Sequence, residues 1–291
     1  MDIPATLVTM KRVSNPLPYL LRRKLLPAAL LLLLSTVAEA DPWRQLDRGL
    51  ELGTFTVEQA GGGNTITILR VDPRFWELRI LSQEEFGHSG GLSAREWAKR
   101  HKLTAAINAG MYLSDHNTHA GYMKVDDRIE SRHINRYRSL AAFSPYNGKE
   151  EPFRIFDLND VDSDLRTLEK RYRYLLQNLR LIQRPSINRW DRQTKGWNEA
   201  ALGEDRNGRA LFIYSHTPLP MRRLNEALLA LPIELVAAQH LEGGSEAQLY
   251  VQHNGFEREL AGGLTPSFTN QQMNLGAWPI PNVIGIVPRK P

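Results

Sequence analysis

Two apolar segments that end in small-residue turns hold the residues best suited to chemistry in this chain. Residues 103–112 read LTAAINAGMY, and residues 236–250 read VAAQHLEGGSEAQLY. The amide of Asn108, at the end of the first apolar run, can donate to and accept from a ligand hydroxyl or phosphate oxygen. The Glu242 carboxylate precedes Gly243 and Gly244, whose backbone N–H groups can approach a ligand and form an anion-binding nest. The two strand-to-turn junctions predict one composite site.

The two segments resemble two sequence boxes of the phosphodiester glycosidase family, Asn-Ala-Gly-aromatic and Leu-Asp-Gly-Gly-Ser, in the same order along the chain. The resemblance extends over roughly residues 55–287. It implies a hydrolase that attacks the bond between an anomeric carbon and oxygen, with Asn108 and Glu242 at the catalytic centre. The substrate-binding residues that we predict around them are Gly110, Tyr112, Gly121, Gly243, Gly244 and Ser245.

Two positions depart from the family pattern. Glu242 stands where the family box has Asp, so its carboxylate reaches one methylene further. Before the small-residue strand at residues 201–203, the family pattern has an Arg suited to bidentate binding of a phosphate, and this chain has Asn198 and Glu199. A lost phosphate contact would imply a different leaving group. If another cation takes over that contact, the candidates are Arg192, Lys195, Arg180 and Lys124.

Carboxylates that could serve as acid or base are Glu242, Glu199, Glu246 and Asp115. Glycoside cleavage commonly pairs an acid with a base, and the separation of the two carboxyl groups sets the stereochemistry. We predict Glu242 and Glu199 as catalytic residues. With a phosphate leaving group of low basicity the general acid is dispensable, so one carboxylate could then suffice.

Trp190 and Trp197 bracket a basic stretch at residues 189–195 that includes Arg192. Indole faces stack on sugar C–H surfaces and basic groups hold phosphate, so we predict Trp197 and Arg192 at the rim of a phosphosugar site. The alternative is that both indoles cover the edge of the core below a loop.

Two histidines follow the first box. His116 and His119 lie on a polar loop at residues 114–120, beside Asp115. A zinc site would require a third ligand and a defined scaffold. Proton transfer near neutral pH suits His119 better, and we predict it as a catalytic residue. An ordinary polar loop is the alternative.

The stretch Gly87-His88-Ser89-Gly90-Gly91 matches the G-x-S-x-G pattern of serine hydrolases. That pattern requires an apolar strand immediately before it, and here the polar residues 83–86 intervene. A serine hydrolase is therefore disfavoured. The sequence also has no P-loop and no dinucleotide fingerprint.

Composition narrows the class further. The 291 residues include no Cys, which excludes disulfides, Cys-ligated metals and thiol catalysis. Residues 41–291 contain 32 basic and 30 acidic residues, and acids interrupt the densest basic stretch at residues 166–184. Nucleic acid is therefore not an expected partner. The expected partner is a carbohydrate or phosphosugar substrate. No cofactor is implied with certainty, and calcium is the cation to test.

Alternating strand patterns dominate the elements that must position these residues. Strands are expected at residues 54–59, 64–71, 76–82, 103–107, 122–125, 128–132, 139–143, 153–156, 175–182, 199–203, 209–214, 235–241, 247–252 and 283–287. Helices are expected at residues 93–101, 162–172 and 221–231, the first opened by a Ser93–Glu96 capping box. Because regular βαβ alternation is missing, we predict an α+β single domain, with a largely antiparallel or mixed sheet flanked by a few helices.

The N-terminus has the pattern of a secretory signal. Basic residues precede an apolar run at residues 25–37, and Ala38 and Ala40 suit a cleavage site. We therefore predict a signal peptide at residues 1–40, a glycosidase-like domain at residues 41–291, and a secreted or periplasmic product that meets the membrane only through the signal segment. An uncleaved anchor is the alternative.

Together these patterns predict a glycoside or phosphodiester glycosidase-like hydrolase that acts on a sugar linkage of an envelope glycan or exopolysaccharide. The alternative from another class is a catalytically degenerate glycan-binding protein of the envelope, because the two departures could mark a pocket that has lost turnover.

Expression with the intact N-terminus should give a mature protein that starts at Asp41, since small residues at positions 38 and 40 follow the apolar run. N-terminal sequencing of the exported product checks this. A membrane-bound product that retains residues 25–37 would rule out cleavage.

Overall fold

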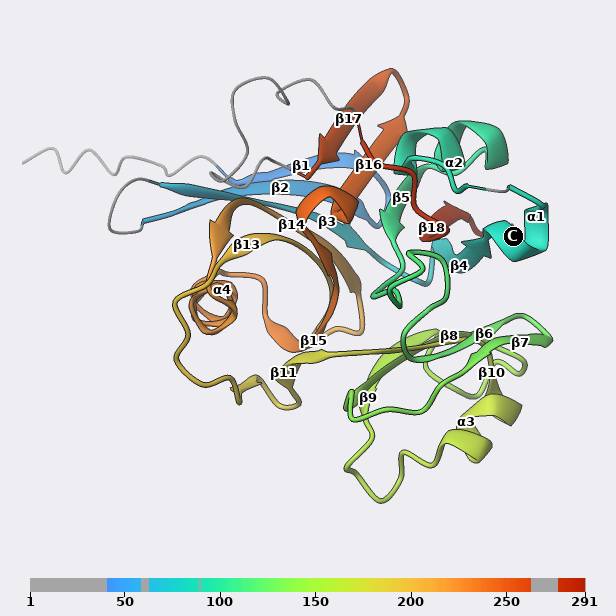
Figure 1. Cartoon of the computed structure of the whole chain (residues 1–291). Helices are drawn as coiled ribbons and strands as arrows, with labels where there is room; N and C mark the ends of the chain where they lie inside the picture. The colour runs from blue at the N-terminus through green and yellow to red at the C-terminus, as the bar shows by residue number, and fades with distance from the viewer. Residues whose placement is uncertain (1–40, 59–62, 89, 263–276, 291) are drawn as a thin grey trace, which may run out of the picture. The chain divides into compact units, whose positions relative to one another are not determined.

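The structure is a computed structural model, and it describes residues 41–58, 63–88, 90–262 and 277–290 (Figure 1). The predicted signal peptide and Ser89 lie outside the described residues. In the described part of the chain, no helix is long and apolar enough to cross a membrane.

The described residues form three sheets in which all paired strands are antiparallel. The largest has eight strands in the order β1 (Trp43–Asp47), β2 (Leu50–Val57), β3 (Asn64–Val71), β14 (Ala210–Leu219), β13 (Trp197–Asp205), β15 (Leu235–Gly243), β11 (Arg180–Gln183) and β12 (Ile187–Asn188). The second runs β17 (Phe256–Ala261), β16 (Gln248–His253), β5 (Ala105–Asn108), β18 (Asn282–Pro288) and β4 (Trp76–Ser82). The third runs β7 (Arg128–Arg132), β6 (Tyr122–Val125), β10 (Tyr172–Asn178), β8 (Ser139–Pro145) and β9 (Phe153–Asp157).

One hydrophobic core joins the three sheets. Leu202 and Phe212 of the largest sheet, Ile107 of the second, and Phe143 and Leu176 of the third are all fully buried in it. Alternation along each strand explains this, because every second side chain points to the same face. The strand ends that carry the chemistry are thus fixed relative to one another by a shared interior.

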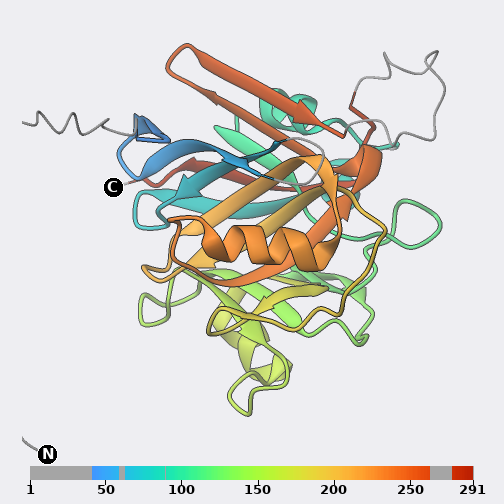
Figure 2. The same cartoon turned by 90° about the vertical axis from the view of Figure 1, so that its left-hand side faces the viewer.

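A helix covers the other face of each sheet. Leu228 of α4 (Met221–Ala230) packs on the largest sheet, Trp97 of α2 (Ala94–His101) on the second, and Leu168 of α3 (Leu165–Arg171) on the third. Figure 2 shows α4 lying across the largest sheet. Two short helices, α1 (Gln83–Phe86) and the 3-10 turn η1 (Gly244–Glu246), follow β4 and β15. The predicted α+β class with few helices is confirmed.

Several expected elements have the bounds that the pattern gave, among them β3, β4, β6 and β7. The strand expected at residues 175–182 is wrong as one element. It is divided between β10 and β11, which belong to different sheets. The break falls at Leu179, whose carbonyl accepts from the backbone N–H of His240 at 2.8 Å. The apolar run shows no sign of this crossing.

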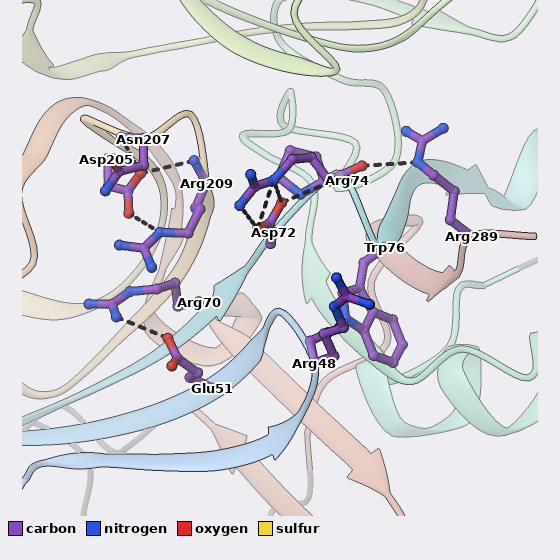
Figure 3. Close-up of polar contacts among 11 residues, drawn as sticks. Arg48, Glu51, Arg70, Asp72, Arg74, Trp76, Asp205, Asn207, Arg209 and Arg289 are labelled. Atoms are coloured by element: carbon purple, nitrogen blue, oxygen red, sulfur yellow. Dashed lines mark hydrogen bonds and ion pairs between the residues drawn. The ribbon is translucent and has the colours of Figure 1, made fainter. Parts of the chain in front are cut away.

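A polar network fastens the turns at one end of the largest sheet (Figure 3). The Asp205 carboxylate accepts from Nε of Arg209 at 2.6 Å across the turn between β13 and β14. Arg289, which follows β18, donates from Nε to the carbonyl of Pro73 at 2.9 Å. The opposite ends of β13 and β15 carry the candidate site.

Ser93→Ala should lower the free energy of unfolding by about 1 kcal/mol, because it removes an N-cap. The Ser93 hydroxyl accepts from the backbone N–H of Glu96 at 3.3 Å, and the backbone N–H of Ser93 donates to the Glu96 carboxylate at 2.8 Å. Urea unfolding measures the change, with Ser114→Ala in an exposed loop as control. Equal effects of the two substitutions would contradict a stabilising cap.

Candidate active site

The pairing of β13 with β15 builds the centre of the site. Glu199 is opposite Gly243, Ala200 is opposite Glu242, and Ala201 is opposite His240. Leu241 therefore has no partner in β13, which makes this point a β-bulge. Bulges re-aim side chains and are common beside active sites.

Glu199, His240 and Glu242 form a row of neighbouring side chains, which we call the Glu–His–Glu row. Oε1 of Glu199 is hydrogen-bonded to Nδ1 of His240, and Nε2 of His240 lies 4.0 Å from Oε1 of Glu242. The indole N–H of Trp197 donates to the other oxygen of Glu199 at 3.2 Å. Glu199 and His240 are buried, whereas 23% of the Glu242 side chain is exposed. Glu242 is the member that a ligand can reach.

The protonation of Glu242 suits acid–base chemistry. Burial raises the pKa of Glu242 to about 7, and the charges of Glu246 and Glu199 act in the same direction. The cation of His240 and the backbone N–H of Gly243, which donates to Oε1 at 3.1 Å, oppose this rise. A carboxyl group with such a pKa can give and take a proton near neutral pH.

The charge of His240 is held by its neighbour. Burial by itself lowers the pKa of His240, but the Glu199 carboxylate outweighs burial, so the net pKa is raised. Glu199 in turn avoids the large cost of a buried charge without a partner. Burial also raises the pKa of Glu199, against the charge and the hydrogen bond of His240, so the pair holds a proton beside Glu242.

Asn108 connects the two boxes. It ends β5, is fully buried, and accepts at Oδ1 from the backbone N–H of Gln248 at 3.1 Å. Its Nδ2 has no hydrogen-bond partner among the described residues. The observed contacts are those of a residue that positions the second box.

Gly110 and Tyr112 extend this junction. Gly110 has φ 151°, and a Cβ there would lie 2.5 Å from Oδ1 of Asn178, so a larger residue does not fit. Tyr112 donates to Oδ1 of Asn282 at 3.1 Å. Burial raises the pKa of Tyr112 well above its usual range, and the charges of Glu242 and Glu246 add to this. Tyr112 therefore lies close to the acidic residues of the second box.

The glycine turn of the second box is packed against an indole. A Cβ at Gly243 would lie 2.4 Å from Cδ1 of Trp197, and Gly244 adopts φ 68°. The carbonyl of Gly244 accepts from Nδ2 of Asn198 at 3.1 Å. The turn thus holds Trp197 against Glu199, and Ser245 follows in η1, half-buried.

His119 is buried and uncharged. Its Nε2 donates to the carbonyl of Gln177 at 3.0 Å, and burial lowers the pKa of His119 to about 4. Its Nδ1 has no partner among the described residues, which leaves a free acceptor. Gly121 makes this packing feasible, since a Cβ there would lie 2.4 Å from the same carbonyl.

Two adjoining clefts lie beside these residues. One of about 540 Å³ is lined by His119, Glu130 and Asn282, and one of about 500 Å³ by Tyr112 and Glu246. They share Gln83, Gly90, Asn117 and Pro281. The second cleft contains Tyr112 and Glu246, which both lie close enough to Glu242 for an electrostatic effect, while Glu199, His240 and Glu242 are not among the lining residues of either cleft.

Two predicted substrate-binding cations are not part of this cluster. Nζ of Lys124 donates to the hydroxyl of Tyr146 and to the carbonyls of Glu169 and Tyr172, at 2.7–3.0 Å, on the side of the third sheet that α3 covers. Arg192 is exposed and lines a separate cleft of about 370 Å³ beside α4.

The remaining polar candidates lie on the loop before β6. Exposed Asp115 accepts from the Thr118 hydroxyl, which holds the pKa of Asp115 at about 2. His116 lies 3.5 Å from Glu246. Over the described ranges, no three His, Cys, Asp or Glu side chains are grouped as a metal site would require.

His240 was not predicted as a site residue. His240 lies in the mostly apolar stretch of residues 235–241, and this pattern predicts a structural strand without indicating a site residue. No local spacing rule could have found it, because the β-bulge at Leu241 interrupts the alternation of side chains between His240 and Glu242.

The antiparallel scaffold thus places a carboxyl group of raised pKa, Glu242, beside His240 at the ends of two paired strands. A model of the family described as phosphodiester glycosidase matches residues 101–287. The chain belongs to the phosphodiester glycosidase family, as its two boxes predicted.

Solved structures share the fold at low identity. The catalytic domain of zebrafish N-acetylglucosamine-1-phosphodiester alpha-N-acetylglucosaminidase, auto-inhibited by its pro-peptide, is 14% identical with a TM-score of 0.62, and the match covers 84% of this chain and 86% of that one. A hypothetical protein from Synechocystis is 13% identical with a TM-score of 0.53, over 87% of this chain and 65% of that one. No curated protein matches the sequence.

Glu242→Gln should stabilise the protein more at pH 8 than at pH 5, relative to wild type. Folded Glu242 keeps its proton up to a pKa of about 7, and the unfolded chain releases it near the ordinary value of 4.5. The unfolded state binds fewer protons between these values, so wild-type stability falls as pH rises there, by at most about 3 kcal/mol.

Urea unfolding at the two pH values measures this difference. Exposed Glu151→Gln is the matched control, and its effect should not change with pH. If the effect of Glu242→Gln is also constant, the pKa of Glu242 is not raised.

Proposed function

We propose that this protein is a secreted or periplasmic hydrolase that cleaves a glycosidic or sugar-1-phosphodiester linkage of an envelope glycan or exopolysaccharide. The single observation that carries the proposal is Glu242, a partly exposed carboxyl group whose pKa is raised to about 7 and which lies 4.0 Å from the buried His240. Membership of the phosphodiester glycosidase family supports a sugar-containing substrate. The sequence pattern of the N-terminus supports export.

Glu242 serves this reaction as general acid and then as general base. Its proton passes to the oxygen that leaves the anomeric carbon, and the carbon–oxygen bond breaks. Water attacks the anomeric carbon and returns a proton to the Glu242 carboxylate, so the proton balance closes. Proton transfer of this kind typically contributes about 10²–10⁴-fold to the rate.

The surrounding residues position Glu242 and the substrate. Glu199 keeps His240 charged, and the His240 cation stabilises Glu242 after it has given up its proton. Asn108 fixes the second box through the backbone of Gln248. Trp197 and Tyr112 supply aromatic surface beside the acidic residues, the usual surface for a sugar ring.

A glycan-binding protein without turnover is the second candidate. The observation that favours it is the 4.0 Å separation of His240 from Glu242, which is longer than a hydrogen bond. A glycan-binding protein needs the pocket but does not need a proton donor at Glu242.

Glu242→Gln should lower kcat by at least about a hundredfold on the best unactivated substrate, because it keeps the shape and removes the proton. The screen uses the mature protein with methyl and aryl α-glycosides, disaccharides and UDP-linked amino sugars, with and without calcium. Asn108→Ala should raise KM as well as lower kcat, since it loosens the second box.

Glu151→Gln and Ser89→Ala serve as controls and should leave kcat unchanged. Full activity in Glu242→Gln would exclude Glu242 as the acid, and loss of activity in Ser89→Ala would restore the serine-hydrolase interpretation. Glycan binding without turnover, abolished by Asn108→Ala, would establish the binding protein.

A further inference from the structure

Among the described residues, no Lys or Arg forms an ion pair with the acids around Glu242. Within 4 Å of Glu199, Glu242 and Glu246, the ion pairs in the described ranges involve only His240 and His116. The two clefts are lined by Glu84, Glu130, Asp115 and Glu246 and by no Lys or Arg, and Arg128, outside the lining, pairs with Glu130 at 2.7 Å. Residues 59–62, 89 and 263–276 contain no Lys or Arg in the sequence either.

A phosphodiester requires the opposite arrangement. Its bridging phosphate carries a negative charge, and protein sites that bind phosphate use Arg forks, Lys or backbone nests. One donor of the nest expected at the second box is already taken, because the N–H of Gly243 donates to Glu242. The position that would suit such an Arg holds Glu199, which is fully buried and bound to His240.

The Glu–His–Glu row can supply a proton to the leaving group, and a phosphate leaving group does not require that proton. A phosphate leaves as a stable anion, whereas an alcohol leaves only if its oxygen receives a proton. A buried arrangement that keeps a proton on Glu242, with a cation ready to stabilise the carboxylate afterwards, is useful only for the alcohol.

We infer that Glu199, His240 and Glu242 act as one proton-holding unit, and that the substrate is a sugar–sugar linkage without phosphate, whose leaving group is an uncharged alcohol. This inference rests on the proposed hydrolase function. In the step, the O–H of Glu242 protonates the glycosidic oxygen, the anomeric carbon–oxygen bond breaks with its electron pair on that oxygen, and an alcohol departs. Glu199 and His240 are positioning residues, because they act through Glu242.

Leaving-group dependence tests the substrate class. Mature wild-type protein is assayed with 4-nitrophenyl and methyl glycosides of one sugar and with the UDP derivative of that sugar. We expect both glycosides to be cleaved and the UDP-sugar to have a kcat/KM at least about a hundredfold lower, because like charges in a desolvated site repel strongly. Glu242→Gln should lose far more activity on the methyl glycoside than on the 4-nitrophenyl glycoside, whose leaving group needs little protonation.

The pH profile tests the unit itself. The nearby groups that titrate or carry charge are His240, Glu199, Glu246, Tyr112 and Tyr137. Glu199→Gln removes the partner that keeps His240 charged, so the basic limb of kcat/KM should move to higher pH. Glu246→Gln removes a negative charge and should move the same limb to lower pH. Glu246 is partly exposed, so this variant still tests the unit if the buried Glu199→Gln fails to fold.

The outcomes separate the two proposals. Preferential cleavage of the UDP-sugar, or competitive inhibition by inorganic phosphate, would leave the hydrolase function standing and overturn the phosphate-free substrate. A basic limb that Glu246→Gln does not move would overturn the proton-holding unit. No turnover of any substrate in the panel would overturn the hydrolase function, and this inference with it.

Discussion

The buried ion pair between Glu199 and His240 is the interaction on which the site depends. Two ionisable side chains at the ends of β13 and β15 are placed where water does not reach Glu199. Breaking such a pair by removing one partner typically costs about 3–5 kcal/mol, because the other charge is left buried alone. The register of the two strands and the bulge at Leu241 are therefore constrained together: a slip of one residue would separate the pair and also turn Glu242 to another direction.

Polar contacts between strand ends transmit this constraint to the first box. The backbone N–H of Gln248 is held by Asn108, and the side chain of Gln248 accepts from the backbone N–H of Ala94 at 2.8 Å, at the first turn of α2. One residue thus satisfies groups from β5, β16 and a helix N-terminus. Buried polar networks of this kind are costly when incomplete, so they fix one arrangement of the elements around the site.

The sequence predicted the scaffold better than the centre of the site. Apolar runs marked the strands that enter both boxes, and the Ser93–Glu96 capping box marked the start of α2, because these signals are local. The crossing at Leu179 was missed, since a strand-like segment such as residues 175–182 has the same appearance whether it serves one sheet or two. His240 was missed for a related reason: its importance comes from Glu199 on the neighbouring strand, and pairing register is a property of the fold.

The two departures from the family pattern, Glu199 and Glu242, have a common physical explanation when they are considered together with His240. Glu199 alone, at a fully buried position, would be an uncompensated charge, and His240 alone would lose its proton to burial. Together they form a hydrogen-bonded pair, and the other imidazole nitrogen, Nε2, faces the second box. The extra methylene of Glu242 extends its carboxylate toward Nε2 of His240. The distance of 4.0 Å between Nε2 and Oε1 of Glu242 is short enough for a strong electrostatic effect in a buried site. It is too long for a hydrogen bond that would occupy the proton. An Asp at this position would stop one methylene short and weaken that coupling. The three residues therefore depend on one another, and the register of β13 with β15 places all of them.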